Sequence, residues 1–165
     1  LALFRRLMEV NYLGAVYCLH PALPHLKERG GQFVAISSIQ GRVAVPHHTG
    51  YVASKHALQG FCDALRMELA DTGVNVLTVL LHWLRGTELR EHAFGADGQP
   101  IGEQRRQHSG ESVSLGEASS AILDGIGQRR RELVIPWKLK ALAAVHALRP
   151  QLSEAIVRRA VNKQD

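Results

Sequence analysis

The chain has 165 residues, of which 45% are hydrophobic and 21% are charged, and its formal net charge is +5. This length and apolar content are typical of a single folded domain and exclude a disordered tail. Aromatic residues make up only 5% of the chain. This argues against nucleic-acid binding, because proteins that bind single-stranded DNA or RNA place aromatic side chains among their Lys and Arg residues to stack on the bases.

The first half of the chain alternates between helical and extended patterns. The expected elements are a helix over 2–28, a buried strand over 32–37, a loop over 41–50 and a helix over 51–71. Pro21 and Pro24 are expected to bend the last turns of the first helix. Glycines end both helices, at Gly30 and at Gly73.

The second half continues the alternation. The expected elements are a buried strand over 75–81, a helix over 115–128, a strand over 132–136 and two short helices within 137–162, separated by Pro150. The polar, glycine-rich segment 85–113 is too long for an ordinary connection and is predicted to be a substrate lid. The C-terminal extension 137–165 is basic enough for a membrane surface. Its interspersed acid and modest length favour a packed or solvated helix pair.

The order of these elements predicts an α/β fold. Helices that alternate with short buried strands form right-handed crossovers, so we expect one domain over 1–165 with a parallel sheet of about three strands. Ligand sites of such sheets lie beyond the carboxyl ends of the strands. Ser38 follows the first strand at that edge, and the predicted lid begins there too.

Tyr51 and Lys55 are the first candidates for chemistry. They stand four residues apart near the start of a helix, so their side chains share one face. A nearby ammonium favours the phenolate and lowers the pKa of the tyrosine, which then exchanges protons with a carbonyl or an alcohol. From the strand end, Ser38 is placed to hydrogen-bond the same substrate oxygen. The alternative is a half-buried tyrosine beside a solvated lysine.

Asn11 adds a fourth candidate, because asparagine is a mediocre helix former and needs a reason to stand inside a helix. It lies 27 residues before Ser38, in the segment VNYLGAV (10–16). With AISSIQG (35–41) and YVASKHAL (51–58), this segment resembles the catalytic tetrad of the short-chain dehydrogenases/reductases. The resemblance extends from the first residue to about ELVIP (132–136).

The resemblance implies a Rossmann-like three-layer fold with an incomplete doubly wound sheet. It implies that Tyr51 is the acid/base and Ser38 positions the substrate oxygen. It also implies that Lys55 lowers the tyrosine pKa and binds the nicotinamide ribose, and that Asn11 holds a relay water. Tyr51, Lys55 and Thr87 would contact NAD or NADP, which supplies the hydride for a small-molecule carbonyl or alcohol. The helices over 2–28 and 51–71 would form a homodimer or homotetramer.

Two departures from the family pattern leave a second hypothesis open. The sequence has no GxxxGxG or GxGxxG motif after a strand, which would hold the pyrophosphate. Leu81-His82 stands where relatives carry Pro-Gly, and Thr87 lies one residue late. The chain is therefore either an oxidoreductase or a non-catalytic relative that acts as a dimerising interaction module.

Other functional classes have little support in the sequence. There is no HExxH motif, and neither Cys18 nor Cys62 has metal-type spacing, so we expect no metal and two buried, reduced thiols. No run approaches about 18 uncharged apolar residues, and the N-terminal segment lacks a signal-peptide cleavage site. We therefore expect a cytoplasmic protein without a transmembrane segment.

Overall fold

A three-stranded parallel sheet forms the centre of the computed structural model, which describes residues 1–88, 93 and 112–162. The strands are β1 (Gln32–Ser38), β2 (Asn75–Leu81) and β5 (Glu132–Ile135), in the order β1-β2-β5. Ser38 pairs with Leu81, and Leu81 pairs with Ile135, so all three carboxyl ends meet at one edge. The predicted α/β fold with a parallel sheet is confirmed.

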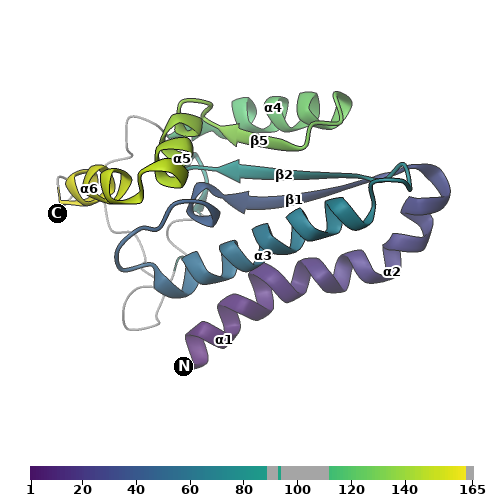
Figure 1. Ribbon diagram of the computed structural model, residues 1–165, viewed down its shortest axis with the longest axis horizontal. Coiled ribbons are helices and arrows are strands. Elements are labelled where there is room, and N and C mark those ends of the chain that lie inside the picture. Colours follow the sequence, from purple (N-terminus) through teal and green to yellow (C-terminus); the bar gives the residue numbers. More distant parts are fainter. Residues whose placement is uncertain (89–92, 94–111, 163–165) are drawn as a thin grey trace.

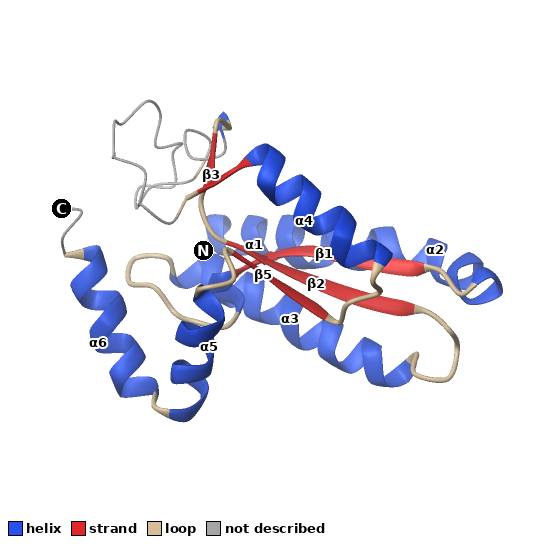
Figure 2. Cartoon of the chain, turned by 90° about the horizontal axis from the view of Figure 1, so that it is seen from above, coloured by secondary structure: helices blue, strands red, loops and turns tan. Residues whose placement is uncertain are grey.

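Helices cover both faces of this sheet (Figures 1 and 2). One face carries α1 (Ala2–Met8), the π-helical turn η1 (Glu9–Leu13), α2 (Gly14–Arg29) and α3 (Thr49–Glu68). The other face carries α4 (Leu115–Gly127). Val76 of β2 packs in the core beside α3, whereas Leu77 packs in the core beside α4. Because successive side chains of the central strand β2 point to opposite faces, they pack against the helices on both sides of the sheet and form a helix–sheet–helix arrangement of three layers.

The edge strand β1 is covered less completely than the sequence suggests. Its apolar run predicts burial on both faces, and Ala35 is indeed buried beside α3. Ile36, which points to the opposite face, is 46% exposed. Because β1 pairs only with β2 among the strands that the structure describes, the opposite edge of β1 carries no neighbouring strand.

The N-terminal helical run begins and ends about where it was predicted, but its interior differs. It contains the π-helical turn η1, which the apolar spacing did not indicate. It also continues through Pro21 and Pro24 to Arg29, where Gly30 ends it with a left-handed φ of 60°. Only a residue without a side chain adopts that backbone conformation at no steric cost.

The segment after β2 forms a small second sheet that was not predicted. β3 (Leu84–Arg85) and β4 (Val113–Ser114) pair in parallel. Residues 89–92 and 94–111, the greater part of the predicted lid, lie outside the described residues. The C-terminal helices are α5 (Leu139–Leu148) and α6 (Pro150–Val161), which confirms the two-helix prediction and the break at Pro150. Within the described ranges, no helix is long and apolar enough to cross a membrane.

Candidate active site

The end of β1 and the start of α3 are packed directly against each other. The short 3₁₀ turn η2 (Ile39–Gly41) follows β1, and the Ser38 hydroxyl caps it by accepting a hydrogen bond from the backbone N–H of Gln40 at 3.2 Å. A Cβ on Gly41 would lie 3.0 Å from the carbonyl oxygen of Lys55 and 3.1 Å from Oγ of Ser37. The glycine therefore allows the close approach that brings Ser38 to the first turns of α3.

Tyr51 and Lys55 lie together on α3, as their spacing predicts. The Nζ atom of Lys55 is 5.6 Å from the centroid of the Tyr51 ring, which is within the range of a cation–π contact. The lysine is buried, and its Nζ donates a hydrogen bond to the carbonyl oxygen of Ile36 at 3.3 Å. The cation is thus held between strand β1 and the tyrosine ring.

Burial controls the protonation of this pair. It raises the pKa of Tyr51, and hydrogen bonding with the Ser38 side chain offsets this only in part. Burial also lowers the pKa of Lys55. In the net shift of the Tyr51 pKa, the loss of water around the phenolate thus outweighs the favourable neighbours. At neutral pH, Tyr51 therefore retains its proton. The expectation that Lys55 lowers the tyrosine pKa stays a prediction.

Asn11 reaches the same helix from the π-helical turn η1. Its Nδ2 donates a hydrogen bond to Oγ of Ser54 at 3.0 Å, and Ser54 in turn donates to the carbonyl oxygen of Tyr51 at 2.8 Å. Single π turns are frequent at functional sites. The position of Asn11 in η1 explains why an asparagine stands inside a helix, because its side-chain amide hydrogen-bonds a residue of the neighbouring helix α3.

Thr87 and His82 lie beyond the end of β2. The Oγ1 atom of Thr87 is buried, and it has no hydrogen-bond partner among the residues that the structure describes. The backbone N–H of His82 donates to the carbonyl oxygen of Ile135 at 2.9 Å, which extends the pairing of β2 with β5 past Leu81. Within the described part of the chain, this edge therefore holds one buried threonine hydroxyl whose hydrogen bond is unmade.

Gln40, a polar neighbour of His48, is a residue that the sequence did not single out. Gln40 is buried, and its Oε1 lies 3.0 Å from Nδ1 of His48, the residue just before α3. His47 is exposed and has a left-handed φ of 65°. The position of Gln40, two residues after Ser38, was the available signal.

The two cysteines differ in environment, and the expectation of two buried thiols is wrong for one of them. Cys62 is fully buried, whereas Cys18 is exposed. Across the ranges that the structure describes, no group of three or more His, Cys, Asp or Glu residues is arranged to hold a metal ion.

The chain is similar to known proteins over most of its length. Residues 1–96 match the family "short chain dehydrogenase". The rat protein "Dehydrogenase/reductase SDR family member 7B" is 33% identical over 97% of this chain and 49% of its own length. The Anopheles gambiae protein "Dehydrogenase/reductase SDR family protein 7-like" is 32% identical over 96% of this chain and 50% of its own length. The chain thus spans about half the length of the curated relatives that it matches.

Solved structures agree with the observed fold. A short-chain dehydrogenase from Burkholderia cenocepacia, solved in complex with NADP, aligns with a TM-score of 0.74 and 27% identity, over 93% of this chain and 58% of that one. A short-chain dehydrogenase from Sphingobium yanoikuyae, in complex with NADPH, aligns with a TM-score of 0.68 and 22% identity, over 91% and 56%. At that lower identity the likeness concerns the fold alone.

Proposed function

Since this chain belongs to the short-chain dehydrogenase/reductase family, we propose that it is an oxidoreductase that reduces a carbonyl group, or oxidises the corresponding alcohol, with NAD or NADP. The observation that supports this most is the position of Tyr51, whose ring centroid lies 5.6 Å from Nζ of the buried Lys55 at the end of the strand that carries Ser38. The Burkholderia relative, at 27% identity, binds NADP, which supports a nicotinamide dinucleotide as the cofactor.

In the proposed reduction, Tyr51 is the proton donor. Its raised pKa keeps the phenol protonated at neutral pH, and a general acid must carry its proton before the reaction. The Ser38 hydroxyl donates a hydrogen bond to the same substrate oxygen and fixes its position. The nicotinamide cofactor, when bound, supplies the hydride to the carbonyl carbon.

Lys55 acts on the charge that develops as Tyr51 gives up its proton. The ammonium stands 5.6 Å from the ring centroid in a buried setting, where charges interact more strongly than in water. It therefore stabilises the phenolate that the proton transfer creates. Asn11 and Ser54 hold the first turn of α3 in place through the carbonyl oxygen of Tyr51.

Part of a nicotinamide cofactor fits the groups that the chain presents. Lys55 supplies a cation and Tyr51 a hydroxyl for the ribose. The buried Oγ1 of Thr87, which has no partner among the described residues, suits a carboxamide. Unpaired buried hydroxyls are costly, so a partner for Thr87 is expected on energetic grounds. The sequence has no GxxxGxG or GxGxxG motif that would hold the pyrophosphate.

The test uses the longest natural polypeptide that contains these residues. Binding of NADPH and NADH is followed by fluorescence, and oxidation of the bound nucleotide by absorbance with a panel of aldehydes and ketones. Tyr51→Phe should abolish turnover and leave nucleotide binding nearly unchanged, whereas Tyr17→Phe, at an exposed tyrosine of α2, should have no effect. Absence of binding to both nucleotides, or full activity of Tyr51→Phe, would overturn the proposal.

The alternative function, a dimerising interaction module, has its own observation. Phe4, Val10, Tyr17 and Met67 are large exposed apolar side chains of α1, η1, α2 and α3, the helices through which a homodimer or homotetramer was expected. Sedimentation equilibrium tests this. Concentration-dependent association that Val10→Ser with Met67→Ser abolishes supports the module, and a strict monomer contradicts it.

A further inference from the structure

The α5–α6 hairpin and the residues that follow it hold most of the net charge of the chain. Residues 137–165 contain six Lys or Arg residues and two acidic residues, which is +4 of the total +5. Five of the cations are described, and all are exposed: Lys138, Lys140, Arg149, Arg158 and Arg159. Between 137 and 162 the single acidic residue is Glu154. The hairpin therefore presents a strongly positive surface.

The same hairpin exposes large apolar side chains. They are Trp137 at 73% exposed, Leu148 at 79%, Leu152 at 54% and Ile156 at 44%. Ala141 and Ala144 are also exposed, and the spacing 141, 144 and 148 follows one side of α5. Trp137 lies in the turn just before this helix. Leu152 and Ile156 are four residues apart on α6 and share a side in the same way. Each helix thus has an outward apolar stripe.

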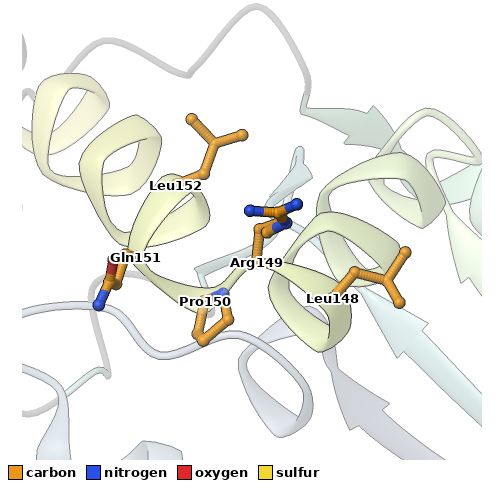
Figure 3. Close-up of a pocket in the computed structure, with 5 residues that line it drawn as sticks. All are labelled: Leu148, Arg149, Pro150, Gln151 and Leu152. Carbon is orange, nitrogen blue, oxygen red and sulfur yellow. The ribbon is translucent and has the colours of Figure 1, made fainter.

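The two stripes meet at the turn of the hairpin. A hollow of about 440 Å³ is lined by Leu148, Arg149, Pro150, Gln151 and Leu152, and Figure 3 shows Arg149 between the two leucines. The opposite side of α6 is used for packing, because Ser153 and Val157 are buried and Oγ of Ser153 lies 2.6 Å from Nδ1 of His146 on α5. The exposed leucines are therefore not needed to hold the two helices together.

We propose that the α5–α6 hairpin binds the surface of an anionic lipid bilayer. Exposed leucine and isoleucine on short helices, with a tryptophan at the helix start and Lys and Arg beside them, are typical of segments that lie in the membrane interface. The apolar stripes enter the headgroup region, and the five cations contact lipid phosphates and carboxylates.

Charge distinguishes this surface from one that pairs with a second copy. In a two-fold dimer, the same patch of both copies meets itself. Pairing through the hairpin would bring five cations of one chain against five of the other, and like charges placed across an interface oppose association. The exposed apolar residues of α1 and η1, by contrast, stand among charges of both signs, such as Arg5 and Glu9.

The hairpin lies close to the candidate active site but does not depend on it. Leu139 of α5 packs in one cluster with Ile39, the residue after Ser38, and Figure 1 shows α5 and α6 at the end of the sheet where the strands finish. A bound bilayer would therefore lie beside the carboxyl edge of the sheet. The inference holds whether or not the proposed reaction is correct.

The test is co-sedimentation of the full chain with lipid vesicles. We expect binding to phosphatidylcholine vesicles that contain about 30% phosphatidylserine, and a loss of about fivefold in affinity for each cation removed by Lys138→Gln or Lys140→Gln. Added salt should weaken binding. Leu148→Ser with Leu152→Ser should weaken binding by at least about tenfold.

Matched controls separate the hairpin from the rest of the surface. Leu123→Ser, at an exposed apolar residue of α4, and Lys27→Gln with Arg29→Gln, at exposed cations of α2, should leave binding unchanged. Circular dichroism checks that each variant is folded. Absence of binding, equal binding to vesicles of phosphatidylcholine alone, or loss of binding only in the controls overturns the proposal. So does self-association without lipid that Leu148→Ser with Leu152→Ser abolishes, because a second copy would then cover this face.

Discussion

The side-chain amide of Asn11 donates a hydrogen bond to the hydroxyl of Ser54, 43 residues later in the chain, across 3.0 Å. Asn11 belongs to the π-helical turn η1, and Ser54 immediately precedes Lys55 on α3. The Ser54 hydroxyl in turn donates a hydrogen bond to the carbonyl oxygen of Tyr51. The first turns of α3, which position the candidate tyrosine and lysine, are therefore tied to the N-terminal helices by a polar contact.

This contact should appear as a coupling between the two residues. In a double-mutant cycle of Asn11→Ala and Ser54→Ala, we expect an interaction free energy of about 0.5–1.5 kcal/mol, because a hydrogen bond is lost in either single variant. Urea denaturation of the four proteins measures it. A control cycle of Asn11→Ala with Thr72→Ala, whose hydroxyl bonds the carbonyl of Leu69 at 2.8 Å, should be additive. Additivity of the first pair would contradict the assignment.

The protonation of Tyr51 gives a second prediction. Because burial raises its pKa, Tyr51 should ionise above the ordinary value of about 10, whereas a lysine-activated tyrosine would ionise below it. Tyrosine ionisation is followed by ultraviolet absorbance as the pH rises, in the wild-type chain and in Tyr51→Phe. The difference between the two titration curves reports the ionisation of Tyr51. A difference spectrum that develops below the ordinary value would show that the cation outweighs burial.

The sign of the related stability effect follows from linkage. A group whose pKa is raised by folding binds its proton more tightly in the folded state, so its contribution is full below the unfolded pKa and is lost as the pH rises through the folded one. We expect the free energy of unfolding to fall above about pH 10, and to fall less in Tyr51→Phe. Urea denaturation of the wild type and of Tyr51→Phe, below and above about pH 10, measures the free energy of unfolding in each case.

Gly41 should be intolerant of a side chain. In Gly41→Ala, the new Cβ would meet the carbonyl oxygen of Lys55 at 3.0 Å and Oγ of Ser37 at 3.1 Å, and the backbone oxygen of a helix does not yield easily. We expect a loss of about 1–3 kcal/mol in the free energy of unfolding, as for other overpacked sites. Gly60→Ala is the matched control on α3, because its Cβ would meet nothing within 4 Å. A Gly41→Ala protein as stable as the wild type would show that η2 and α3 are not in close contact.

The two thiols should react at very different rates. Cys62 is buried and its pKa is raised to about 11 by that burial, so the reactive thiolate is scarce at mildly alkaline pH. Cys18 is exposed. We expect one thiol to react rapidly with a thiol reagent in the native chain and the second only after unfolding. Mass spectrometry identifies each, and Cys18→Ser should remove the fast reaction. Rapid labelling of Cys62 in the native chain would contradict its burial.

The sequence predicted the elements of the fold well where the pattern was local. The strand over 75–81 is found at the expected residues, and the other helices and strands differ from their expected bounds by a few residues. The π-helical turn and the β3–β4 pair escaped prediction for different reasons. A single widened turn leaves the apolar spacing nearly unchanged, and two-residue strands carry no periodicity to detect.

The residues of the candidate site likewise fall into those that local sequence spacing predicts and those that only the folded chain brings together. The spacing of Tyr51 and Lys55, the asparagine inside a helix and the serine at a strand end are visible in the chain itself, because a helix turn places residues i and i+4 on one face whatever surrounds them. Gln40, beside His48, was missed because only the folded chain brings them within 3.0 Å.

What the sequence determined by itself was therefore the order of helices and strands, the family, and which side chains share a face. Tertiary structure alone decided that Asn11 reaches Ser54, that Cys18 is exposed, and that the pKa of Tyr51 rises instead of falling. Periodicity arises from bonds between near neighbours along the chain. The free energy of a buried charge depends on every group that replaces water around it, and those groups come from distant segments.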